Sequence, residues 1–160
     1  CHWISNAQNI IIIGPTGVGK TYLACSFANR ACRMGFPAFY IRLPRLFQEM
    51  AIARADGSYP NIMKKLFKTK VLIIDDLGLA PMTVAERRDL LEVVEDRHGA
   101  SSTVVTTQLP IDHWHENIRD PTIADAILDR LVHNAHKINL KGESMRKLRS
   151  SLTNKSNIGK

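Results

Sequence analysis

The 160-residue sequence lacks long apolar runs and paired cysteines. No window approaches eighteen consecutive apolar residues, which excludes a membrane-spanning helix and a membrane protein. The three cysteines, Cys1, Cys25 and Cys32, form no C-x-x-C pair and are odd in number, which favours a reducing, cytoplasmic location. The chain begins without Met or a charged-then-apolar signal segment, so nothing indicates secretion. We expect it to be a piece of a longer polypeptide.

The composition excludes disorder over most of the chain, because 44% of residues are apolar and only 23% are charged. That balance and length suit one globular domain with a core of its own. The net charge is +7 and is unevenly distributed: residues 141–160 hold six basic residues and one acid, whereas the first 140 residues are nearly neutral. The excess predicts an anionic partner, with nucleic acid ahead of a membrane surface; the alternative is a basic tail that is simply solvated.

Short apolar runs alternate with segments of helical spacing. Strands are expected at residues 9–13, 38–41, 71–74, 103–107 and 136–140. Helices are expected at residues 19–34, 43–55, 62–67, 84–98 and 121–133, with a last basic helix starting at 144 and a frayed end at 153–160. Thr83 and Glu86 form a capping-box pattern before the fourth of these helices. The alternation predicts an α/β domain with a five-stranded parallel sheet flanked by helices, and it leaves the strand order open.

One motif is specific enough to indicate a ligand. The run Gly14, Pro15, Thr16, Gly17, Val18, Gly19, Lys20, Thr21 matches G-x-x-x-x-G-K-[ST] at every fixed position. Glycines let successive backbone N–H groups point at phosphates, and the following helix adds its positive end. We expect Lys20 to reach the β and γ phosphates, Thr21 to ligate Mg²⁺, and the adjoining Tyr22 to lie in the nucleotide site. The alternative is a tight strand-to-helix turn with no ligand.

A pair of acids follows the third expected strand. Asp75 and Asp76 come directly after four apolar residues, so they should emerge at the carboxyl edge of the sheet, where ligands bind in such folds. We expect Asp75 to hold Mg²⁺ through a water and Asp76 to act as the general base for hydrolysis. The alternative is a pair of acids that caps the entry to the next helix.

The sequence resembles the IstB-like ATP-binding proteins of bacterial insertion sequences. These are AAA+ ATPases of the P-loop NTPase class, related to DnaC-type helicase loaders and DnaA-type initiators. The resemblance rests on NIIIIGPTGVGKT at 9–21, VLIIDDLG at 71–78, TTQLP at 106–110, Trp114, AILDRLVH at 126–133 and GESMR at 142–146. It implies an ATPase core over residues 1–141, the start of a lid helix and a basic tail over 142–160, and a helical N-terminal region that this chain lacks.

The resemblance also implies roles for three further residues. Gln108 matches the sensor of the γ phosphate, where the family more often has Asn. Arg130 matches the arginine finger that acts in a neighbouring subunit's site, which implies a homo-oligomer with active sites at subunit interfaces. Arg146 matches the second sensor, on the lid. Asp76 replaces the Glu of many AAA+ relatives, and the shorter acid is consistent with slow, partner-stimulated turnover. Without the resemblance, Arg130 is expected to be a solvated helix-surface residue beside Asp129, and Arg146 to be one member of a basic helix.

A basic helical pair is the candidate DNA contact. This pair of helices is expected between residues 43 and 67. The resemblance implies that it occupies the position where the related initiators and loaders have an extra element that faces DNA. The cationic residues concerned are Arg42, Arg45, Arg54, Lys64, Lys65 and Lys68. Contacts from such residues to phosphates would bind double-stranded DNA largely without regard to sequence. The alternative is an ordinary amphipathic helix pair whose polar face is in water.

Three functions remain open from the sequence. The first is an ATP-binding and ATP-hydrolysing, Mg²⁺-dependent protein that assembles on DNA and assists a transposase. The second is a loader whose partner is a replicative helicase. The third is a small-molecule kinase, which shares the phosphate loop but needs an acceptor pocket and no arginine from another subunit.

Overall fold

A single sheet of five parallel strands organises the chain. The computed structural model describes residues 1–148. The strands are β1 (Asn9–Ile13), β2 (Ala38–Arg42), β3 (Val71–Leu77), β4 (Ser102–Thr107) and β5 (Ala135–Asn139). Their order across the sheet is β2-β3-β4-β1-β5, and every neighbouring pair is parallel. The prediction of five parallel strands is confirmed, and the order, which the sequence pattern left open, places β4 between β1 and β3.

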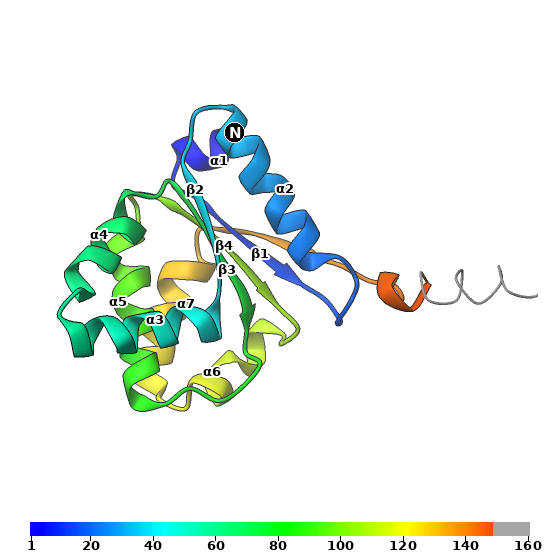
Figure 1. The fold of residues 1–160 in the computed structure, drawn as a ribbon. Coiled ribbons are helices and arrows are strands. Elements are labelled where there is room, and N and C mark those ends of the chain that lie inside the picture. The colour runs from blue at the N-terminus through cyan, green and yellow to red at the C-terminus, as the bar shows by residue number, and fades with distance from the viewer. Residues whose placement is uncertain (149–160) are drawn as a thin grey trace, which may run out of the picture.

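Helices cover both faces of this sheet (Figure 1). The short α1 (His2–Ser5) and the long α2 (Lys20–Arg33) pack on one face. The other face carries α3 (Leu43–Asp56), α4 (Tyr59–Lys68), α5 (Val84–Arg97), α6 (Trp114–Ile118) and α7 (Pro121–Val132), with the 3₁₀ turn Ile111–His113 before α6. None of the helices within residues 1–148 is long and apolar enough to cross a membrane.

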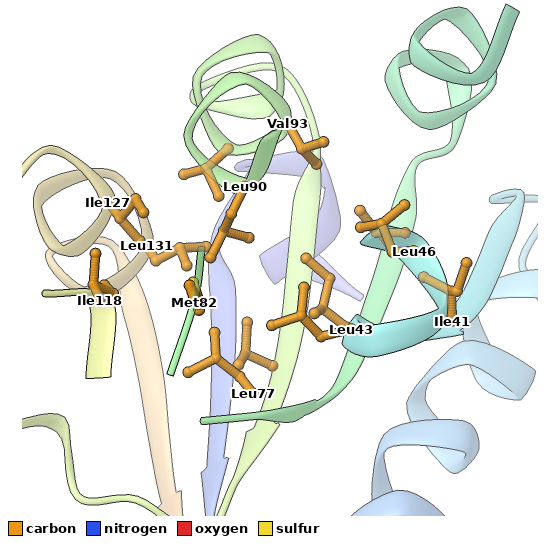
Figure 2. Packing of buried hydrophobic residues seen from close by; sticks show 14 of the residues in the cluster. Ile41, Leu43, Leu46, Leu77, Met82, Leu90, Val93, Ile118, Ile127 and Leu131 are labelled. Carbon is orange, nitrogen blue, oxygen red and sulfur yellow. The ribbon is translucent and has the colours of Figure 1, made fainter. Parts of the chain in front are cut away.

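Residues 10–13 of β1 and residues 71–74 of β3 are apolar on both sides because helices cover both faces of the sheet there. Ile10 and Ile12 of β1 join the cluster beneath α2, whereas Ile11 joins the larger cluster on the opposite face. In that larger cluster, apolar side chains from α3, α5, α6 and α7 meet above the sheet (Figure 2). The two clusters fix the strands from both faces and leave the carboxyl ends of the strands for polar residues.

Several element boundaries differ from the sequence expectation. β3 continues to Leu77 and includes both acids, where the apolar run predicted an end at residue 74. α4 begins at Tyr59, because Pro60 fits the first turn of a helix, where its missing N–H is not needed. β5 lies one residue earlier than expected, and α1 and α6 were not predicted, because elements this short have no periodicity to detect. The capping box of Thr83 and Glu86 is confirmed.

The end of the described chain is helical at residues 145–148, and the Ser144 carbonyl accepts the N–H groups of Lys147 and Leu148. This agrees with the helix predicted to start at 144. The frayed end predicted at 153–160 lies outside the described residues.

A buried arginine joins three elements at the amino edge of the sheet. Arg97, at the end of α5, is only 2% exposed and donates to the carbonyl oxygens of Leu66, Thr69 and Ser102 and to the Thr103 hydroxyl. Burial lowers the pKa of its guanidinium to about 10. Leu66 belongs to α4, Thr69 to the turn that precedes β3, and Ser102 and Thr103 to β4. The side chain of Arg97 therefore links elements that are distant in sequence.

We expect Arg97→Met to lower the free energy of unfolding by about 3 kcal/mol, because several buried carbonyl groups lose their donor. The matched control is Arg88→Met on the exposed face of α5, where a change within about 0.5 kcal/mol is expected. Urea denaturation followed by circular dichroism measures both. Equal stabilities of the two variants would contradict the structural role of Arg97.

Candidate active site

The glycine-rich loop joins β1 to α2 and has a backbone that only glycine adopts easily. Gly17 and Gly19 have φ values of 81° and 101°, in the left-handed region. A Cβ on Gly14 would lie 2.7 Å from the Leu140 carbonyl oxygen, which leaves no room for a side chain. Gly19 is also the N-cap of α2 and makes no side-chain capping bond. The first N–H groups of α2 are therefore available to an anion.

The side chain of Lys20 folds back into the phosphate loop and binds its backbone carbonyl groups. Its side chain is buried, and Nζ donates to the carbonyl oxygens of Gly14 at 2.7 Å and Pro15 at 2.8 Å. Burial lowers the pKa of Lys20, and the nearby Asp76 and Asp75 carboxylates oppose that shift. A cation therefore lies within the curl of the loop, where negatively charged phosphates would meet it.

Asp75 is a buried carboxylate held by three hydroxyl groups. It is 3% exposed and accepts from Thr21 Oγ1, at 2.9 Å to Oδ2 and 3.1 Å to Oδ1. The Tyr40 hydroxyl donates to Oδ2 at 2.7 Å, and the Thr106 hydroxyl donates to Oδ1. Burial, and then the bond to Asp75, raise the pKa of Tyr40. The Asp75 carboxylate and the Thr21 hydroxyl are hard oxygen ligands of the kind that Mg²⁺ prefers, so they fit the metal that the phosphate loop implies.

Asp76 lies in a bulge within β3. The sequence predicts a position beyond the end of this strand, and that prediction is wrong. The pairing register shifts between Ile74 and Leu77, and Asp76 has a φ of 65°. Its N–H donates to Thr106 Oγ1 at 3.1 Å. Its side chain pairs with Arg42 at the end of β2, from Nη2 at 2.7 Å and Nε at 2.8 Å. Asp76 also lines a cavity of about 400 Å³ between α3 and the loop that follows β3, so water can reach it.

Two more of the predicted residues lie near this edge of the sheet. Gln108 is exposed and directly follows β4, in a turn shaped by the Thr107 hydroxyl, which accepts from Leu109 N at 2.9 Å. Met145 donates its N–H to the Gly17 carbonyl oxygen at 2.9 Å, so the helical residues 145–148 rest on the phosphate loop. Arg146 is exposed there and follows the residue that makes this contact.

Arg130 lies at the other edge of the sheet. The carbonyl oxygen of Arg130 accepts a hydrogen bond from Asn9 Nδ2 at 3.2 Å. Asn9 is the first residue of β1, whereas Lys20 and the phosphate loop follow the last residue of that strand. The first and last residues of a five-residue strand are about 13 Å apart. The guanidinium pairs with Glu95 at 3.0 Å and donates to the Ala126 carbonyl oxygen at 3.0 Å. The structure does not bring Arg130 into this chain's own site.

The six cationic residues predicted to contact DNA fall into two groups. Four have partners within the chain: Arg42 pairs with Asp76, Arg45 with Glu49 and Arg54 with Asp89, and Lys65 lies 3.8 Å over the Phe39 ring. Lys64 and Lys68 of α4 are exposed and, within residues 1–148, have no such partner. The basic helix pair is therefore a smaller free cationic surface than the sequence indicates.

Sequence reasoning gave no role in this site to three of its residues, although it named Arg42 as a DNA contact. Tyr40 and Arg42 come from β2, which lies beside β3 in the sheet. The sequence pattern does not give the strand order, so it could not predict that these side chains meet the two acids. Thr106 contacts both acids across β3 and β4. The polar Thr106 and Thr107, which follow two valines in a buried strand, are the one signal that could have drawn attention to this segment.

Comparisons with known proteins identify the family of this chain. The family model described as IstB-like ATP binding protein matches residues 1–153. The insertion-sequence ATP-binding protein y4pL of Sinorhizobium fredii is 52% identical over 145 residues, which cover 91% of this chain and 59% of that protein. The chain therefore spans less than two thirds of the length of this curated relative.

Solved structures of AAA+ proteins share the fold. The DnaC helicase loader superposes with a TM-score of 0.72 at 17% identity, over 88% of this chain and 85% of that chain. AMPPCP-bound DnaA from Aquifex aeolicus gives 0.70 at 15% identity, over 99% of this chain and 50% of that chain. These likenesses show a P-loop AAA+ fold, and the family match identifies the type of protein. The chain belongs to the IstB-like ATP-binding proteins of insertion sequences.

Proposed function

We propose that this chain is the ATP-binding and ATP-hydrolysing core of a protein that assembles on DNA and assists a transposase. The observation that carries the ATPase part is the convergence of Lys20, Thr21, Asp75 and Asp76 around an uncapped helix start. The relatives of this family come from insertion sequences, which supports the transposition part.

In the proposed reaction the loop amides and Lys20 hold the phosphates, and Asp76 accepts a proton from the attacking water. Thr21 and Asp75 would hold Mg²⁺, which neutralises charge on the phosphates when bound. We assign contacts with the γ phosphate to Gln108, which directly follows β4, and to Arg146, in the segment whose Met145 N–H bonds to the phosphate loop. Both contacts from Arg42 go to Asp76 Oδ2, so Asp76 Oδ1 is the oxygen that we assign to accept the proton.

We expect Asp76→Asn to retain ATP binding and to lower the hydrolysis rate at least about 100-fold, because the amide cannot accept the proton. Lys20→Ala is the matched control and should lose binding itself. A fluorescent ATP analogue measures affinity, and phosphate release measures turnover. Hydrolysis by Asp76→Asn at the rate of the unmodified protein would show that another group is the base.

We place Arg130 in the site of a neighbouring subunit. Its position at the amino edge of the sheet, far from its own phosphate loop, supports this role, and so does the resemblance to the arginine finger. One subunit's amino edge would then face the next subunit's carboxyl edge, a head-to-tail contact that builds a ring or a filament.

Mixing two inactive variants tests this assignment. Arg130→Ala subunits bind ATP but supply no finger, and Lys20→Ala subunits supply the finger but bind no ATP. A mixture should therefore recover part of the ATPase activity at interfaces where the two meet. The matched control replaces the second variant by Lys20→Ala/Arg130→Ala, which should give no recovery. Equal activity in both mixtures would exclude a role in trans.

DNA is the proposed scaffold for assembly, and α4 offers its free cationic contacts at Lys64 and Lys68. The likeness to the DnaC helicase loader supports a second candidate, in which the partner is a replicative helicase. The two candidates differ in the partner that stimulates the ATPase. In the first it is the transposase of the same insertion sequence, and in the second it is the helicase. The third possibility, a small-molecule kinase, receives no support from the family match.

We expect affinity for double-stranded DNA to fall steeply with salt, and the Lys64→Ala/Lys68→Ala variant to reduce the slope of log affinity against log salt by about 2. Arg88→Ala, an exposed cation on α5, is the control and should leave the slope unchanged. Fluorescence anisotropy with two unrelated duplexes measures the slope and the sequence preference. A flat salt profile would exclude phosphate contacts.

A further inference from the structure

We propose that Thr106 is a positioning residue that sets both acids of the site through one hydroxyl group. The inference rests on the ATPase proposed above and goes beyond it, because no role in the reaction has been given to this side chain. It starts from an otherwise unexplained feature, a polar side chain with no solvent exposure in the middle of the sheet.

Both hydrogen bonds of this hydroxyl go to the acid pair. Thr106 Oγ1 donates to Asp75 Oδ1 and accepts the N–H of Asp76 at 3.1 Å. A hydroxyl has one hydrogen, and the Asp76 amide can only donate. The hydrogen of Thr106 therefore points at Asp75, and the orientation of the group is determined by its two partners.

The bulge in β3 makes this hydroxyl necessary. Ile74 pairs with Val105 and Leu77 with Thr107, so Asp75 and Asp76 together stand opposite the single residue Thr106. The extra residue of a bulge is left out of the ladder, and without Thr106 the partly buried N–H of Asp76 would lose its hydrogen-bond acceptor. The Thr106 hydroxyl replaces that partner and holds Asp76 at a φ of 65°, which residues other than glycine rarely adopt.

The consequence is a coupled geometry of the two carboxylates. At the bulge the Asp75 carboxylate meets Thr21, while the Asp76 carboxylate reaches Arg42 and the cavity beside α3. Thr106 thus connects the proposed metal ligand to the proposed base.

Tyr40 provides an internal comparison. Its hydroxyl also donates to Asp75, at 2.7 Å, but it has no contact with the Asp76 backbone among the hydrogen bonds of residues 1–148. Tyr40→Phe should disturb Asp75 alone, whereas Thr106→Val should disturb both acids. Val has the shape of Thr and lacks only the hydroxyl, and Thr106→Ser restores it.

The first readout uses the nucleotide-free protein. Hydrogen exchange by NMR should show the Asp76 amide exchanging at least about 10-fold faster in Thr106→Val than in the unmodified protein, with protection regained in Thr106→Ser and retained in Tyr40→Phe. Thr69→Val is the control, because it removes another buried hydroxyl, bonded to the Lys65 carbonyl oxygen, at the opposite edge of the sheet.

The second readout is ATP affinity with and without Mg²⁺, together with kcat. In Thr106→Val we expect Mg²⁺-free affinity within about 2-fold of the unmodified protein, a lost Mg²⁺-dependent gain, and kcat lowered at least about 10-fold, all restored by Ser. Unchanged Asp76 exchange in Thr106→Val, or a Ser variant that fails to restore it, overturns the inference. An unmodified protein that does not hydrolyse ATP would instead refute the proposed function, and the exchange comparison would still decide the role of Thr106.

Discussion

The rest of the structure depends on how one buried carboxylate obtains its hydrogen bonds. Asp75 lies out of water near the carboxyl end of the inner strand β3, where an unpartnered charge would be strongly unfavourable. Its partners are Thr21 on α2, Tyr40 on β2 and Thr106 on β4. Because each comes from a different element, satisfying this carboxylate also fixes α2, β2 and β4 around β3. The candidate active site is therefore part of what orders the sheet.

Strand order then divides the charged groups between two edges of the molecule. With β4 between β1 and β3, the phosphate loop and the two acids stand one strand apart at the carboxyl edge. The amino edge holds Arg97, which is bonded to four acceptors, and Arg130, which is paired with Glu95. Under the proposed function a single subunit thus carries both halves of a site, but on opposite sides. Only contact between subunits can bring the halves together.

What the sequence predicts well is local. The β1 strand, the glycine-rich loop, the first turn of α2 and the capping box of α5 all follow from neighbouring residues, and the structure agrees. The bulge at Asp76, the bonds of Tyr40 and Thr106, and the ion pair of Arg42 arise from strand order and register, which one sequence does not encode locally. Charge is the weakest guide of all. Arg42, Arg45 and Arg54 look like a basic face in sequence, yet each meets an acid in the fold.

These arrangements bear on how fast a lone subunit could work. Asp76 is held at its backbone by Thr106, and its carboxylate oxygen Oδ2 is paired with the Arg42 guanidinium. Arg130, the proposed source of transition-state charge stabilisation, lies at the far edge. Under the proposed function, both features slow hydrolysis in an isolated subunit and leave the phosphate loop that binds ATP unaffected. The proposed subunit therefore retains its nucleotide until a neighbouring subunit, assembled on the same DNA, supplies the missing cation.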